Sequence, residues 1–235
     1  MATTEAGFAS KLGYLTRKDL RVEARGRDTL PPMLAFSFAV VLVLAFTVPE
    51  ENEIGRQALG NILAGFLWIT ILFAGLIGFA RTFEVEREEG ALDALLLAPV
   101  DRSGLFLAKA AANLVFIVAV EILIVPLFTL LFDLDIGRGW PALVLVLALA
   151  DVGFVVIGTL FSSIAAQTRS RELILPLLAL PALVPVFIAA VELTSDLFLG
   201  AGFEAIAQRG WFGILLAFDL LFGIVGSLVF EYAID

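Results

Sequence analysis

Residues 105–132 read LFLAKAAANLVFIVAVEILIVPLFTLLF. Within this run only Lys109 and Glu121 carry charge. A helix needs about 20 apolar residues to cross the roughly 30 Å hydrocarbon core of a bilayer, so the run predicts a tilted membrane-spanning helix. Lys109 lies near one end of it, from where a lysine side chain can extend its ammonium group to the headgroups.

Similar apolar runs lie on both sides of this one. Since lipid offers the backbone no hydrogen-bond partners, helices are the structure that such runs adopt. The sequence therefore predicts an all-α membrane protein with a single transmembrane domain over residues 1–235. The six predicted spans are Pro31–Val48, Ala58–Ala80, Leu105–Phe132, Pro141–Ala165, Leu173–Leu193 and Trp211–Tyr232.

The composition supports this class and excludes several others. Hydrophobic residues make up 60% of the chain and charged residues 17%, against about 45–50% and 25% in soluble domains. The absence of cysteine and histidine excludes disulfides, thiolate chemistry and histidine catalysis, and we expect no metal site and no catalytic residue. A net charge of -9 does not suggest nucleic-acid binding. The chain also lacks GxxxxGK[ST], so it is not itself a P-loop ATPase.

The basic residues predict the orientation. Eleven lysines and arginines fall in the N-terminal segment and in the loops after the second and fourth spans. The opposite loops hold only Arg56, Arg138 and Arg209. Because loops rich in lysine and arginine stay in the cytoplasm, we expect both termini to be cytoplasmic.

Two polar segments are predicted to be more than tails or loops. Residues 1–30 contain Phe8–Asp28, which predicts a basic amphipathic helix at the inner headgroup layer, with Tyr14 on its apolar side. Residues 81–104 begin densely charged and continue into Leu92, Leu95 and Leu96 at helical spacing. This pattern predicts a helix along the cytoplasmic surface, ended by Pro99 and a turn over Asp101–Gly104.

Charged residues and prolines inside the spans form a third group of candidates. At about 1.5 Å per residue, Glu121, Asp151 and Asp219 all lie at or outside the membrane midplane. They predict either a polar outer vestibule or an intersubunit cluster, or they are protonated or hydrogen-bonded groups with a purely structural role. Three prolines in the fifth span predict that it is bent or divided.

Several runs together resemble a known family. EREEGALDALLLAPVDR, over residues 86–102, resembles the coupling segment of ABC-2-type permeases. RDTLPPMLAF (27–36), AAQTRSRELILPLLALPALVPV (165–186) and the terminal FEY (230–232) narrow the resemblance to the haem exporter protein B (CcmB) family. The order of elements agrees over the whole chain, with an N-terminal interfacial helix, six spans and a charged helix between the second and third.

The resemblance implies a homodimeric, noncatalytic permease of the bacterial inner membrane. It implies a separate ATP-binding subunit, a haem-handling membrane partner and a haem chaperone on the outer side, with haem as possible cargo and no tightly bound cofactor. Two further functions stay open. The protein could be a mechanical subunit that couples ATP hydrolysis to release of the chaperone, or a generic ABC-2 exporter. The residues expected to couple to the ATPase are Glu84, Glu86, Glu88, Glu89, Gly90, Leu92, Leu95 and Leu96.

The predicted topology can be tested directly because the chain contains no cysteine. Single cysteines at Gln57 and Arg138 should react with an impermeant thiol reagent added to intact cells. Cysteines at Ser103 and Arg169 should not react until the cells are opened. The opposite labelling pattern would overturn the orientation.

Overall fold

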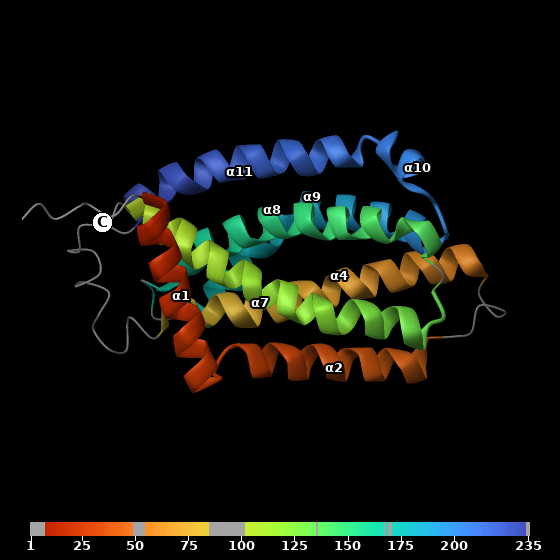
Figure 1. Ribbon diagram of the computed structural model, residues 1–235, viewed down its shortest axis with the longest axis horizontal. Coiled ribbons are helices and arrows are strands. Elements are labelled where there is room, and N and C mark those ends of the chain that lie inside the picture. Colours follow the sequence, from red (N-terminus) through yellow and green to blue (C-terminus); the bar gives the residue numbers. More distant parts are fainter. Residues whose placement is uncertain are drawn as a thin grey trace, which may run out of the picture.

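The computed structural model describes residues 8–48, 55–84, 102–134, 136–166, 168 and 171–233. Every element in these ranges is a helix, which confirms the all-α prediction. Figure 1 shows long helices lying side by side, with α1 across one end of them; we call this end of the bundle the α1 end. The elements are α1 (Phe8–Gly26), α2 (Leu30–Thr47), α4 (Arg56–Arg81), α7 (Arg102–Leu131), the short 3-10 helix η1 (Gly137–Gly139), α8 (Trp140–Ala166), α9 (Arg171–Phe198), α10 (Phe203–Ala207) and α11 (Trp211–Ala233).

The predicted spans correspond to the long helices. In the described residues, five helices are long and apolar enough to cross a membrane, namely α2, α4, α7, α8 and α9. The sixth predicted span is α11, whose shorter apolar stretch covers Trp211–Gly226 within a helix of 23 residues. α8 lies at the centre of the bundle, in contact with α4, α7, α9 and α11.

Some predicted boundaries are wrong. Arg102–Gly104 was expected in a turn but belongs to the first turn of α7. Thr194–Phe198 was expected in an outer loop but continues α9. α9 is also not divided, since the helix runs from Arg171 to Phe198 through Pro176, Pro181 and Pro185. The predicted surface helix after Glu84 lies outside the described residues.

α1 confirms the predicted N-terminal helix but not the placement of Tyr14. The Tyr14 side chain is 71% exposed, on the side opposite to Asp19 and Glu23. Both carboxylates face the bundle. Glu23 accepts hydrogen bonds from the backbone N–H groups of Thr29 (3.0 Å) and Leu30 (2.7 Å), and so caps the start of α2. The junction of α1 and α2 is thereby fixed.

The core contains a reciprocal fit between α4 and α8. A Cβ added at Gly158 would lie 2.1 Å from the Phe79 ring, and one at Gly75 would lie 2.3 Å from the Phe154 ring. Each helix therefore presents a glycine to a phenylalanine of the other. The two rings also meet edge to face, with centroids 5.0 Å apart, a favoured arrangement of aromatic pairs. Small residues that admit close contact are the usual means of helix packing in membranes.

This fit predicts different outcomes for two alanine substitutions. Gly158→Ala should destabilise the protein by about 1–3 kcal/mol, because the new methyl group meets the Phe79 ring in a packed core. Gly65→Ala is the control, because a Cβ at Gly65 meets nothing within 4 Å and alanine favours a helix. The measurement is the thermal unfolding midpoint in detergent. Equal midpoints for the two variants would contradict the reciprocal fit.

Candidate functional site

The predicted coupling residues are only partly described by the structure. Glu84 lies at the α1 end, just after α4. Its carboxylate is 3.1 Å from the guanidinium group of Arg81 in an ion pair. The other predicted members lie outside the described residues: Glu86, Glu88, Glu89, Gly90, Leu92, Leu95 and Leu96.

The chain that leaves α4 is anchored by a buried aromatic ring. Phe83 is 3% exposed and packs with Leu105, Phe106 and Leu160 from α7 and α8. The ring also lies beneath the Lys109 ammonium group, 5.5 Å from the ring centroid, which is within the range of a cation–π interaction. The start of segment 81–104 is therefore held against the bundle.

Polar side chains add a second anchor at the same place. The Thr82 hydroxyl donates to the Asn113 amide oxygen (3.2 Å), and the Asn113 amide nitrogen donates to the Thr159 hydroxyl (3.0 Å). The Ser162 hydroxyl donates to the Phe79 carbonyl (2.5 Å). These contacts join the end of α4 to α7 and α8. A displacement of Thr82 and Phe83 would thus act on three long helices.

Lys109 connects this end of the bundle to α1. Its ammonium group lies 3.2 Å from the Asp19 carboxylate, and the two side chains are only 6% and 13% exposed. The Thr16 hydroxyl donates to the Ala108 carbonyl beside this pair, at 3.3 Å. The expectation that Lys109 extends to the headgroups is therefore wrong, because α1 covers it and supplies its counter-ion.

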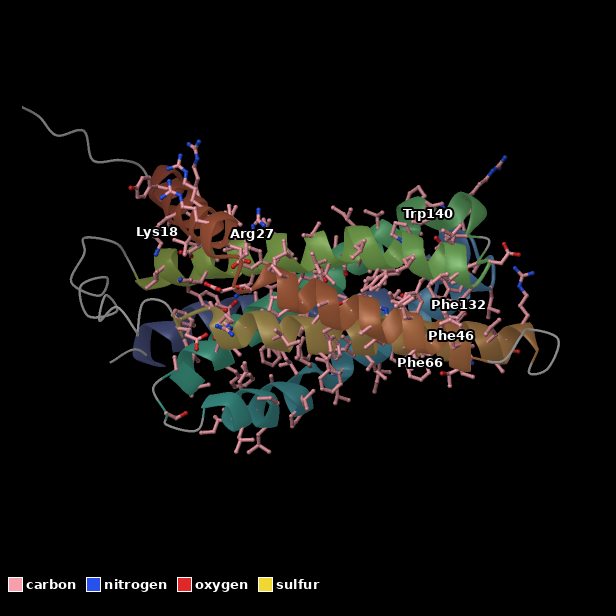
Figure 2. The ribbon with its side chains drawn as sticks, turned by 90° about the horizontal axis from the view of Figure 1, so that it is seen from below. Lys18, Arg27, Phe46, Phe66, Phe132 and Trp140 are labelled. Atoms are coloured by element: carbon pink, nitrogen blue, oxygen red, sulfur yellow. The ribbon has the colours of Figure 1, made fainter. Side chains whose placement is uncertain are left out.

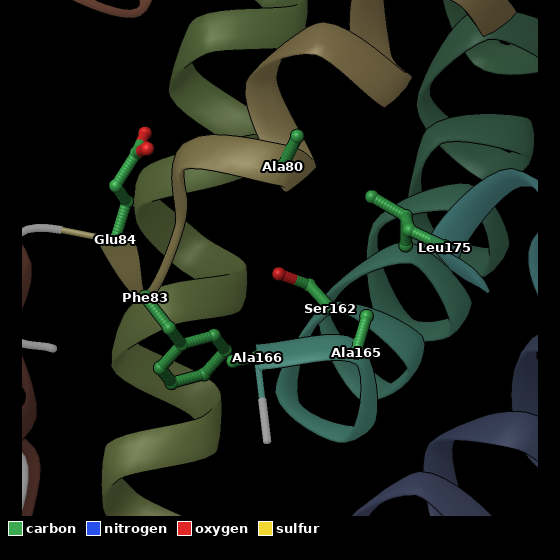
Figure 3. A pocket seen from close by; sticks show the side chains of 7 residues that line it. All are labelled: Ala80, Phe83, Glu84, Ser162, Ala165, Ala166 and Leu175. Carbon is green, nitrogen blue, oxygen red and sulfur yellow. The ribbon is translucent and has the colours of Figure 1, made fainter. Parts of the chain in front are cut away.

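A small pocket marks the point where α4, α8 and α9 meet. Figure 3 shows Ser162 and Leu175 across from Ala80 and Phe83. Its volume of about 10 Å³ suffices for about one water molecule. The pocket does not have the size of a substrate site; it lies between the anchored start of segment 81–104 and the spanning helices. The lining residues are Ala80, Phe83, Glu84, Ser162, Ala165, Ala166 and Leu175.

Two of the three intramembrane acids come together. Glu121 of α7 and Asp151 of α8 are 6% and 1% exposed, and their carboxyl groups lie near enough to influence each other electrostatically. Asp219 of α11 lies against Gly153, two residues further along α8, where an added Cβ would be 2.7 Å from its Oδ1. The sequence did not predict that Glu121 of α7 and Asp219 of α11 both lie near α8, the helix that carries Asp151.

Several carboxyl oxygens of these acids lack a donor in the part of the chain that the structure describes. Neither oxygen of Asp151 receives a hydrogen bond there, and neither do Oε1 of Glu121 and Oδ1 of Asp219. A hydrogen bond between two carboxyl groups requires a proton on one of them. The Glu121–Asp151 contact therefore suits a proton or another cation, and it does not resemble a haem ligand set.

Sequence reasoning missed the contacts of Asn113, Thr159 and Ser162. Asn113 was the available signal, as the one amide in the run 105–132. Such an amide needs partners inside a membrane, and here Thr82 and Thr159 provide them. The identity of these hydrogen-bond partners depends on how α4, α7 and α8 are aligned, which the sequence does not give.

Comparison with known proteins gives a consistent result. A family model described as "CcmB protein" matches residues 10–235. The "Heme exporter protein B" of Rhodobacter capsulatus is 33% identical over 179 residues, covering 76% of this chain and 80% of that protein. The protein of the same name in Paracoccus denitrificans is 31% identical over 175 residues, 74% of this chain and 78% of that protein. The "Heme exporter protein B" of Escherichia coli strain K12 is 28% identical over 97 residues, covering 41% of this chain and 42% of that protein.

The lack of donors around Asp151 yields a stability prediction. Asp151→Asn should raise the free energy of unfolding by about 1 kcal/mol, because the amide can donate to Glu121 without another proton. Asp196→Asn is the control, since the Asp196 carboxylate already pairs with Arg209 at 3.0 Å on the surface. The free energy of unfolding of Asp196→Asn should fall by between zero and about 1 kcal/mol. Chemical denaturation in detergent measures both; a loss of several kcal/mol in Asp151→Asn would mean that a donor binds this carboxylate.

Proposed function

The chain belongs to the CcmB family, and on this premise we propose that it is the permease subunit of an ABC transporter that exports haem for the maturation of c-type cytochromes. The match over residues 10–235 carries the proposal, because it includes nearly all of α1, all the long helices and segment 81–104. The chain contains no P-loop, so a separate subunit hydrolyses ATP. This chain is the noncatalytic membrane part.

The arrangement at the α1 end supports a mechanical link to that ATP-binding subunit. We place the docking surface on Glu84, Glu86, Glu88 and Glu89, with Gly90 as the bend and Leu92, Leu95 and Leu96 as the ridge that holds the helix to the bundle. A force on this surface reaches Phe83 and Thr82 first. From there it passes through Leu160, Asn113 and Thr159 to α7 and α8.

The remaining partners follow from the same premise. The α1 end faces the bacterial cytoplasm in this proposal, in agreement with the distribution of lysine and arginine. A second copy of the chain completes the permease. A haem-handling membrane protein and a haem chaperone act with it at the outer side of the inner membrane.

A mechanical role without haem passage is the second candidate function. One observation favours it: the chain has no histidine or cysteine and only two methionines, so it offers few strong axial ligands for haem iron. In that case the ATPase cycle would release the loaded haem chaperone. ATP-dependent movement of haem into inside-out vesicles supports export. Chaperone release without such movement supports the mechanical role.

The docking surface predicts the effect of a double charge reversal. Glu86→Lys/Glu89→Lys should leave the permease inserted and folded but detach or uncouple the ATP-binding subunit, because carboxylates that meet basic groups are replaced by repelling charges. Glu50→Lys/Glu53→Lys makes the same charge change in the predicted outer loop and should have no effect. Copurification and ATPase activity of the reconstituted complex are the measurements.

Full binding and full activity in the Glu86→Lys/Glu89→Lys variant would refute the docking assignment. Loss of binding in both double reversals would point to a general effect of net charge. A thermal midpoint equal to that of the unmodified protein establishes that the variant is folded.

A further inference from the structure

One side of α1 carries a row of exposed arginines. Arg17, Arg21 and Arg25 follow one another at intervals of four residues, which places them on one side of a helix. None of the ion pairs found among the described residues includes any of the three. Together with Tyr14, Lys18 and Val22 they line a hollow of about 280 Å³. We call the surface formed by Tyr14, Arg17, Lys18, Arg21, Val22 and Arg25 the arginine face.

The two acidic residues of α1 do not neutralise this surface, because both bind groups on the other side of the helix. Asp19 pairs with Lys109 of α7, and Glu23 caps the start of α2. Of the basic residues that form the arginine face, Lys18 pairs with a described carboxylate, that of Asp19 at 3.1 Å. These contacts also fix the rotation of α1 about its axis. The arginine face is therefore cationic and held in one direction.

The direction of this face distinguishes a lipid from a protein partner. Figure 1 shows α1 lying across the long helices. Since the proposal takes these helices to span the membrane, their common direction is taken as that of the membrane normal. Figure 2 shows nitrogen-tipped side chains of α1 pointing to the top of that view, across the long axis of the bundle and away from its other helices. An ATP-binding subunit docked on segment 81–104 would approach from the end of the bundle. Lipid headgroups surround it at the sides.

The mixed chemistry of the face also suits a headgroup layer. Tyr14 is 71% exposed and Val22 is 43% exposed, so an aromatic and an aliphatic side chain lie among the arginines. Tyrosine is enriched at the level of the headgroups, and amphipathic helices at this level combine basic and apolar side chains. A guanidinium group can hold a phosphate by two parallel hydrogen bonds.

We propose that the arginine face of α1 binds the phosphate groups of anionic phospholipids in the membrane leaflet on the α1 side. The proposal requires only that the long helices span the membrane, so it does not depend on haem as cargo. Bound lipid would add to the Asp19–Lys109 contact in holding α1 against α7.

The test uses the full-length protein in detergent, titrated with short-chain phosphatidylglycerol or phosphatidylcholine. Retained lipid is counted by native mass spectrometry. The unmodified protein should prefer phosphatidylglycerol, and Arg17→Gln/Arg21→Gln should weaken its binding about 30-fold, from the usual contribution of two basic residues at an anionic surface. Arg56→Gln/Arg138→Gln, which removes two exposed arginines outside α1, should bind phosphatidylglycerol normally.

Other outcomes would overturn the proposal. They are equal binding of the two lipids by the unmodified protein, or normal phosphatidylglycerol binding by Arg17→Gln/Arg21→Gln. Full displacement of the lipid by millimolar inorganic phosphate would show a site for free phosphate instead. Loss of the ATP-binding subunit with unchanged lipid binding would identify a protein-docking surface. Should the double variant unfold, Arg21→Lys keeps the charge and should weaken binding only slightly, whereas Arg21→Gln should weaken it about 5-fold.

Discussion

The buried ion pair between Asp19 and Lys109 fixes the end of the bundle on which the proposed activity depends. An ammonium group that is 6% exposed inside a membrane protein needs a counter-ion, and Asp19 of α1 supplies one. Removing one partner of such a pair usually costs about 3–5 kcal/mol, since the other charge stays buried. The pair therefore ties α1 to α7. It also positions Lys109 over the Phe83 ring.

Packing contacts connect this end of the bundle to the middle of the long helices. Phe79 and Phe154, each fitted against a glycine of the opposite helix, align α4 with α8. That alignment places Thr82 and Phe83 where they meet α7 and α8. Nearer the N-terminus of α8, Asp151 lies beside Glu121, and Gly153 lies against Asp219. α8 thus contacts both the proposed coupling end and the buried acids, so a shift of α8 would alter both.

Sequence alone predicted the spans well, because apolar length is a property of the chain itself. It failed where the answer depends on a neighbouring helix. Lys109 was expected at the headgroups because nothing in the run 105–132 reveals that Asp19 covers it. Tyr14 was placed on the apolar side because its ring is aromatic, yet its helical position is shared with Arg21 and Arg25. The Glu121–Asp151 contact depends on the relative alignment of α7 and α8, which no pattern in either helix contains.

The central claim is that this chain works as the membrane subunit of an ATP-driven complex. Its most direct test is purification of the tagged, unmodified protein from its native membranes in mild detergent, followed by identification of every protein and porphyrin that accompanies it. The account predicts a stoichiometric ATP-binding subunit in the purified complex. A chain that purifies intact and folded without any ATP-binding protein, from membranes in which its maturation system is active, would contradict it.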